Sequence, residues 1–298
     1  MKGLESMYYN AALVLEGGAM RGCYTSGVLD YFLDRDIQFN CVIGVSAGSL
    51  AGANYVSKQY GRTFEINTEY RNDRDYISVK RLLKGKSIIN LDYLFTDHGI
   101  SWHNYDENAY NLSDTDFVIV ATRLKDGKRV EFHKPPVGKE LTDALEASSS
   151  MPIISKPHET SQGLCLDGGI SDSIPVDLAQ ELGFDKIIVI RTRNREYRKR
   201  PGSKAMEKAI EMNFNQYPDF VKQVNGRPEA YNKQAEELQK MEESKQIFCI
   251  APKEPVKVGR LEHNVKKLKD LYDSGYADAK ESFDEMIEYL EQDQKSAE

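Results

Sequence analysis

The sequence of 298 residues has few of the features that mark secreted or nucleic-acid-binding proteins. It contains four cysteines, one tryptophan and a formal net charge of −7. The cysteines are widely spaced, which predicts buried, reduced thiols rather than a disulfide framework or a metal knuckle. No basic domain dominates, so the acidic balance argues against a nucleic-acid binder.

Long apolar runs are also missing. The first six residues contain no apolar segment of the kind found in signal peptides. No run approaches the roughly 20 apolar residues that a transmembrane helix needs. We therefore expect a cytoplasmic protein, which would have to visit the membrane surface as a peripheral protein if it acts on lipid.

A serine between glycines follows one short apolar run. Residues 41–43 are apolar, G-V-S-A-G follows at 44–48, and a helix is expected over 47–56. A serine on a sharp strand-to-helix turn is exposed, and Gly44 and Gly48 let the backbone turn tightly. This arrangement is typical of a nucleophile, here Ser46, with the helix N-terminus facing the atom that it attacks.

Two other strand candidates also end in chemically distinctive segments. The strand at 11–15 leads into the glycine-rich segment 16–22, whose backbone N–H groups can hold an anion. The strand at 164–166 ends in Asp167, with two glycines after it. In a parallel sheet all three strand ends would share one edge, where ligands bind in open α/β folds.

The rest of the chain alternates in the same way. Helices are expected at 23–34, 139–150 and 176–182, and strands at 117–121, 130–133 and 186–190. The alternation predicts a three-layer α/β/α fold with a mainly parallel central sheet. We expect a catalytic core over 8–195, and a mainly helical C-terminal extension over 196–298 that contributes one strand near 247–250.

Together the three segments resemble the patatin-like phospholipase family over about residues 10–192. That family has a G-G-G-x-R-G oxyanion loop, a G-x-S-x-G nucleophile and a D-G-G or D-G-A aspartate. The resemblance implies a Ser46–Asp167 dyad without histidine or metal, acting on lipid esters of the phospholipase A or lysophospholipase type through an acyl-serine. It also implies an oxyanion loop formed by Gly17, Gly18, Ala19, Arg21 and Gly22.

The chain departs from the family pattern at two positions. Ala19 replaces the third glycine of the loop, and its N–H can still serve an oxyanion hole if the backbone there has no positive φ. Ser173 stands where many relatives have asparagine, which weakens any role borrowed for that side chain.

Other interpretations of these residues remain open. Ser46, Asp167 and His263 follow the chain order of an α/β-hydrolase triad, although His263 lies in a charged helical stretch. Residues 17–22 fit a relaxed dinucleotide fingerprint, but the second strand ends without the acidic residue that holds a ribose. His98 and His103 are weak metal-ligand candidates. A non-catalytic lipid-binding or regulatory protein is the last alternative.

A basic run follows the last strand of the expected core. Seven lysines and arginines stand against one glutamate over 191–204. Near an anionic membrane each such charge contributes about 1 kcal/mol to binding. We expect transient contact with the membrane surface through this run, and its candidate residues are Arg191, Arg193, Arg195, Arg198, Lys199 and Arg200.

Overall fold

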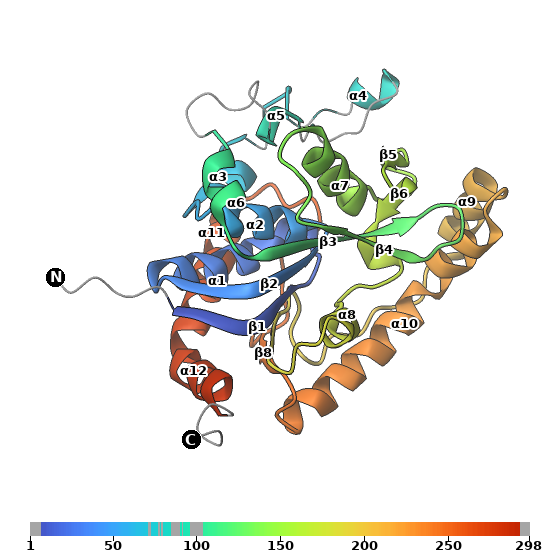
Figure 1. Cartoon of the computed structure of the whole chain (residues 1–298). Coiled ribbons are helices and arrows are strands. Elements are labelled where there is room, and N and C mark those ends of the chain that lie inside the picture. The colour runs from blue at the N-terminus through green and yellow to red at the C-terminus, as the bar shows by residue number, and fades with distance from the viewer. Residues whose placement is uncertain are drawn as a thin grey trace.

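A computed structural model describes residues 7–70, 73–76, 78, 80–84, 90, 92–95 and 104–292. Its centre is an eight-stranded sheet in the order β5-β6-β3-β2-β1-β7-β8, with β4 also paired to β3 (Figure 1). The strands are β1 (Met7–Leu15), β2 (Ile37–Val45), β3 (Asp116–Arg123), β4 (Arg129–His133), β5 (His158–Thr160), β6 (Gly163–Asp167), β7 (Ile187–Ile190) and β8 (Phe248–Ile250).

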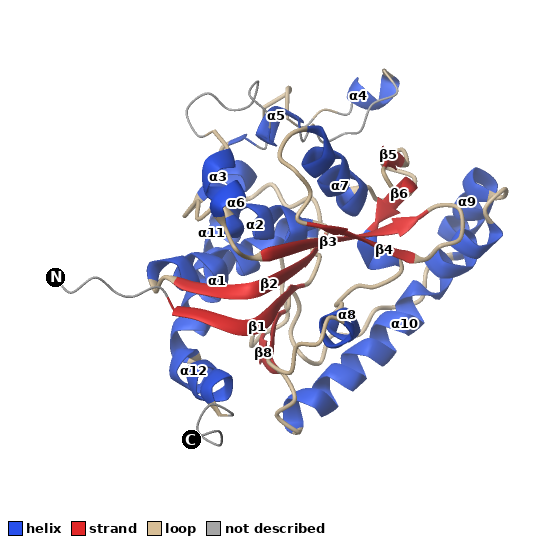
Figure 2. Ribbon diagram, viewed as in Figure 1, coloured by secondary structure: helices blue, strands red, loops and turns tan. Residues whose placement is uncertain are grey.

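Helices cover both faces of this sheet (Figure 2). Along β1, Leu13 and Leu15 belong to a core that also contains residues of α1, α2 and α7, while Ala12 and Val14 pack with α8 and α10. The alternation of a β-strand thus fills two cores. The helices are α1 (Gly22–Asp34), α2 (Ala47–Val56), α3 (Arg62–Thr68), α4 (Lys80–Leu83), α5 (Asp92–Phe95), α6 (Glu107–Leu112), α7 (Lys139–Ser149), α8 (Val176–Glu181), α9 (Lys204–Phe214), α10 (Pro218–Glu243), α11 (Val265–Glu281) and α12 (Phe283–Glu291), with short 3₁₀ turns η1 (Ala19–Arg21) and η3 (Gly168–Ile170).

The register of β3 decides where the strand ends meet. Its residues Val118–Val120 pair with parallel β2 and antiparallel β4, while Ala121 and Thr122 pair with β4 and antiparallel β6. Strands β2 and β6 therefore occupy the same edge of β3, one after the other. Their carboxyl ends face each other, because Val45 pairs with Val120 and Asp167 with Ala121.

The expected α/β/α architecture with a mainly parallel sheet is confirmed. Strands β1, β2, β3, β7 and β8 run parallel. The expectation that the strand before Asp167 joins the parallel set is wrong, since β6 is antiparallel to β3. The sequence also gave no sign of β5, which is a short edge strand.

The C-terminal segments return to the sheet and to its covering helices. Strand β8 extends the parallel sheet beyond β7, as expected near 247–250. Helix α11 packs along α1, and glycines make this contact close: a Cβ on Gly275 would lie 2.1 Å from the Tyr24 carbonyl oxygen, and one on Gly27 would lie 2.1 Å from that of Tyr272.

Two further sequence-based expectations concern the cysteines and membrane-spanning helices. All four cysteines are buried, and no two of them form a disulfide in the described part of the chain. Within the part of the chain that the structure describes, no helix combines the length and apolar character needed to span a bilayer. His98, Trp102 and His103 lie outside the described residues.

The close packing of α1 and α11 predicts a sharp difference between two glycine substitutions. Gly275→Ala should lower the free energy of unfolding by about 1–3 kcal/mol, because its methyl group meets backbone. Gly226→Ala is the matched control: it lies inside α10 with open space around it, so the better helix former should raise stability by up to about 1 kcal/mol. Urea denaturation measures both, and equal effects would contradict this description of the contact.

Candidate active site

Ser46 occupies the sharp turn that its sequence pattern predicts. Its backbone has φ 55° and ψ −123°, a region that favours glycine. A Cβ on Gly44 would lie 2.5 Å from the Ser49 Cα, and one on Gly48 would lie 2.4 Å from the Leu15 carbonyl oxygen. Both glycines are therefore required by close backbone contact.

The end of α7 holds the two facing strand ends together. The Ser148 hydroxyl accepts a hydrogen bond from the Ser46 N–H at 2.8 Å and donates to the Val120 carbonyl at 2.6 Å. Just beyond, the Ser150 carbonyl accepts from the Asp167 N–H at 2.8 Å. The backbones of the serine and the aspartate are thus fixed by one helix terminus.

Asp167 lies at the end of β6 and is 2% exposed. Its Oδ1 accepts a hydrogen bond from the Gly169 N–H at 2.9 Å. Asp167 and Ser46 make no direct hydrogen bond among the described residues, although both line one cavity. Catalytic hydrogen bonds are often long in the absence of substrate and tighten when it binds.

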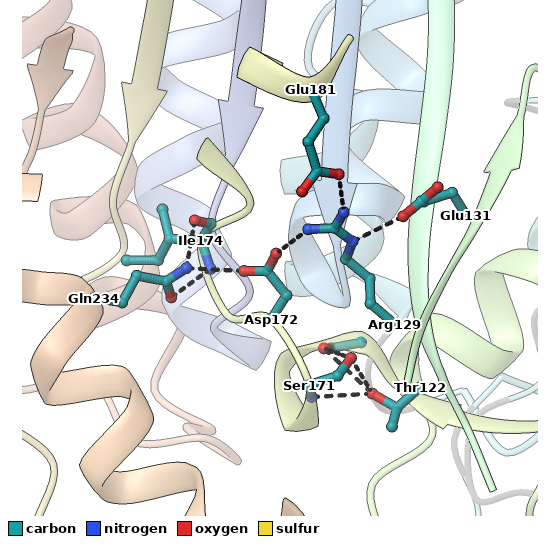
Figure 3. Close-up of polar contacts among 9 residues, drawn as sticks. Thr122, Arg129, Glu131, Ser171, Asp172, Ile174, Glu181 and Gln234 are labelled. Atoms are coloured by element: carbon teal, nitrogen blue, oxygen red, sulfur yellow. Dashed lines mark hydrogen bonds and ion pairs between the residues drawn. The ribbon is translucent and has the colours of Figure 1, made fainter. Parts of the chain in front are cut away.

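Polar contacts from three elements hold the segment after Asp167 (Figure 3). The Thr122 hydroxyl donates to the Asp167 carbonyl at 2.9 Å. Arg129 of β4 pairs with Asp172 at 3.1 Å, and Gln234 of α10 donates to the same carboxylate at 2.9 Å. The network, which the figure draws, extends to Glu131, Ser171, Ile174 and Glu181.

The glycine-rich loop presents unused backbone donors to the cavity. Neither Gly18 nor Ala19 donates its N–H to another group among the described residues. The expectation that the backbone at Ala19 has no positive φ is wrong, because its φ is 49°. The positive φ strains the backbone but does not remove the Ala19 N–H, which has no partner among the described residues. A side chain in this left-handed region costs roughly 1–2 kcal/mol relative to an unstrained backbone, so the loop holds a strained residue beside the strained serine.

A buried network clamps the loop from the other side. Thr192 donates its hydroxyl to the Gly17 carbonyl at 3.1 Å and its N–H to the Glu16 carboxylate at 2.6 Å. The Tyr231 hydroxyl of α10 donates to the same carboxylate at 2.7 Å. A Cβ on Gly17 would lie 3.0 Å from the Ser46 Cβ, so the clamp also sets how closely the loop approaches the serine.

These elements enclose a cavity of about 300 Å³, which is within the range of ligand pockets. All the predicted oxyanion-loop residues line it together with Ser46 and Asp167, whereas Gly44 and Gly48 do not. Part of its wall is apolar, formed by Leu50, Ile66, Tyr76, Leu94, Phe95, Met151 and Ile154.

The histidine of the alternative triad is not part of this arrangement. His263 is exposed in the segment before α11, and its backbone N–H donates to the Glu262 carboxylate at 3.0 Å. No histidine is present among the described residues that line the cavity. The structure therefore does not bring His263 to Ser46 and Asp167.

Parts of the basic run turn inward. Arg191 is 2% exposed, so its expected contact with a membrane surface is wrong. Arg195 pairs with Glu242 of α10 at 2.5 Å, and Arg198 donates to the Arg195 carbonyl at 2.9 Å. Arg193 and Lys199 line the cavity, and Arg200 is exposed.

Several residues of the site were missed in the sequence. Glu16 directly precedes the glycine loop at a strand end, which is the one local signal that was available. Ser148, Tyr231, Arg227 and Arg260 reach the site from distant segments. A Gly-Arg-Pro sequence interrupts the helical pattern around Arg227, yet only the fold shows where that side chain lies.

Comparison with known proteins places the chain in a family. The model described as "Patatin-like phospholipase" matches residues 13–180, and one described as "Domain of unknown function (DUF6363)" matches 217–291. The protein named "Uncharacterized protein YjjU" from Escherichia coli K12 is 29% identical over 269 residues, which are 89% of this chain and 74% of that protein.

A second relative is "Probable lipid hydrolase 463L" from Invertebrate iridescent virus 6. It is 25% identical over 189 residues, or 59% of this chain and 65% of that protein. Among solved structures, VipD from Legionella pneumophila aligns with a TM-score of 0.43 and 12% identity, covering 95% of this chain and 67% of that one. Since the phospholipase match spans more than half of the 298 residues, this chain belongs to the patatin-like phospholipase family.

Proposed function

We propose that this hydrolase cleaves carboxylic esters of lipids, as a phospholipase A or lysophospholipase, through a Ser46–Asp167 dyad. One observation carries the proposal: a serine on a strained turn, a buried aspartate and an apolar wall line the same cavity as Gly18 and Ala19, whose N–H groups have no partner in the described part of the chain. The relative named as a probable lipid hydrolase supports a lipid substrate.

The reaction begins when Ser46 Oγ attacks the ester carbonyl while Asp167 accepts the hydroxyl proton. Gly18 and Ala19 donate their N–H groups to the oxyanion, and such a donor typically contributes about 3–4 kcal/mol in comparable hydrolases. Asp167 then returns the proton to the departing alcohol, which leaves an acyl-serine. A water molecule, deprotonated by the same carboxylate, releases the fatty acid and restores Ser46.

The mouth of the cavity also provides a surface for lipid. Ile153 and Ile154, in the segment after α7, are 43% and 46% exposed, and Ile154 lines the cavity. Leu261 lines it as well and is exposed. Membrane contact in this proposal rests on these apolar side chains and on exposed Arg200, rather than on the whole basic run.

Ser46→Ala should abolish fatty-acid release from mixed phospholipid vesicles and labelling by a fluorophosphonate probe, because the nucleophile is removed. The matched control is Ser155→Ala, since Ser155 lines the same cavity but does not stand on the turn. It should retain release and labelling. Release by Ser46→Ala at the wild-type rate would refute the nucleophile assignment.

Asp167→Asn should lower kcat by about 100-fold to 10,000-fold, the usual contribution of a general base. The amide keeps an oxygen for the Gly169 N–H, so thermal unfolding should change little. Exposed Asp185 provides the control, and Asp185→Asn should leave release unchanged. Normal turnover in Asp167→Asn would remove the dyad from consideration.

Ile153→Glu should weaken binding to phospholipid vesicles by about tenfold or more, because complete burial of an isoleucine contributes roughly 1.5–3 kcal/mol. Leu112→Glu is its control: Leu112 is also exposed but lies at the end of α6. Vesicle sedimentation measures binding for both variants. An equal loss in the two would show that the apolar residues at the mouth have no special part in lipid contact.

A further inference from the structure

The cavity wall opposite the apolar residues is strongly cationic. Among the described residues that line the cavity, cationic side chains outnumber carboxylates five to two. The cations are Arg21, Arg193, Lys199, Arg227 and Arg260, and the carboxylates are Glu16 and Asp167. Apart from Arg21, the cations come from segments beyond β7, whereas the apolar wall comes from residues 50–154.

We propose that Arg227, Arg260 and Lys199, together with Arg21 and Arg193, form a subsite for the phosphate group of an acyl lipid. This proposal rests on the proposed function, because it takes the scissile ester to lie at Ser46. The substrate class is then a glycerophospholipid or lysophospholipid, with its acyl chain on the apolar wall and its phosphate on the cationic wall.

The first argument is that these cations lack protein counterions. None of the five has a carboxylate oxygen within 4.0 Å among the described residues. Arginines elsewhere in the chain behave differently: Arg123 pairs with Asp126 at 2.7 Å, and Arg195 with Glu242 at 2.5 Å. Cations gathered in a cavity without carboxylate partners favour binding of an anion from outside.

The second argument comes from buried nitrogen atoms without partners. Arg21 is 8% exposed, and its Nε makes no hydrogen bond to any described residue; the same is true of the buried Nε of Arg227. Leaving a buried charged donor unsatisfied costs more free energy than leaving a neutral donor unsatisfied. Phosphate oxygens accept from a guanidinium in a forked geometry and would satisfy such donors.

The third argument is that the cations are close enough to repel one another. Burial, and then the neighbouring charges of Arg193 and Arg260, lower the pKa of Arg21 to about 10. Burial, followed by Arg227, lowers the pKa of Lys199 well below its usual value. The positive charge of Arg260 lowers the pKa of both Arg21 and Lys199. One multivalent anion bound between these cations would relieve their repulsion.

The position of Arg227 places this subsite next to the reacting groups. A Cβ on Gly169 would lie 2.7 Å from Arg227 Nη2, so the guanidinium rests against the loop that carries Asp167. Lys199 donates to Ser173 Oγ at 3.3 Å and lies 3.7 Å from the centre of the Tyr231 ring. The phosphate would therefore lie beside the dyad, as a phosphate on the same glycerol backbone as the ester requires.

The test compares kcat/KM for a lysophospholipid with that for a monoacylglycerol of the same acyl chain, in identical detergent micelles. Wild type should prefer the lysophospholipid by about tenfold or more. Arg227→Gln and Arg260→Gln should each lower this preference by about tenfold to a hundredfold, which is the usual effect of losing a hydrogen bond to a charged group. Arg227→Lys should restore part of it.

Lys222→Gln is the matched control, because Lys222 lies on α10 like Arg227 but is exposed and does not line the cavity. It should keep the wild-type preference. A wild-type preference near one, or an unchanged preference in both glutamine variants, would overturn the subsite. An equal loss on both substrates in Arg227→Gln and Arg260→Gln would also overturn it and make these residues positioning groups for Asp167.

Two further measurements distinguish a subsite for lipid phosphate from a site for free phosphate and from a failure of the proposed function. Competition by inorganic phosphate against both substrates, without any lysophospholipid preference, would indicate a site for free phosphate instead of a lipid headgroup. If wild type cleaves neither lipid, the proposed function fails, and calorimetric titration with glycerol 3-phosphate then decides on the subsite. Binding that is lost in Arg260→Gln and kept in Lys222→Gln would support it, and absent binding would refute it.

Discussion

The candidate site depends on one constraint of the sheet: strand β3 extends beyond the end of its neighbour β2. Beyond Val120, which pairs with the last residue of β2, strand β3 continues to Arg123 and pairs there with β6. Because β6 is antiparallel, its carboxyl end points back at that of β2. The strand ends that carry Asp167 and Ser46 consequently face each other. Ser148, at the end of α7, holds this junction through its hydrogen bonds to the Ser46 N–H and the Val120 carbonyl. A parallel β6 on this edge would have directed Asp167 away from the serine.

Around this junction the structure holds groups in positions that cost free energy. Ala19 and Ser46 both have positive φ, and the N–H groups of Gly18 and Ala19 have no protein partner among the described residues. Strain and unused donors of this kind gather at functional sites, where surrounding contacts hold them in place. Here Thr192 provides such contacts, because it donates hydrogen bonds to the Glu16 carboxylate and to the Gly17 carbonyl of the loop.

Local sequence was sufficient for the turn at Ser46, because glycines and an apolar run constrain the backbone over only a few residues. The same holds for the strand ending at Asp167, but not for its direction, which depends on pairing with β3 some 45 residues earlier. Arg191 looked like part of an exposed basic run, since charge alone does not reveal that β7 carries it into the interior. Contacts such as Tyr231 with Glu16, 215 residues apart, leave no local pattern at all.

The contacts of the C-terminal segments bear on whether the extension folds separately from the catalytic core. The sequence favoured a catalytic core over 8–195 with a helical extension, and the contacts support treating the two as one folding unit. Helix α10 supplies Tyr231 to the loop clamp and Gln234 to the aspartate segment, and α11 meets α1 where glycines allow backbone contact. Removing the extension would leave Glu16 without one of its two donors and would expose the α1 face that now packs against α11. We infer that Ser46 and Asp167 take their positions only when the extension is folded against the sheet.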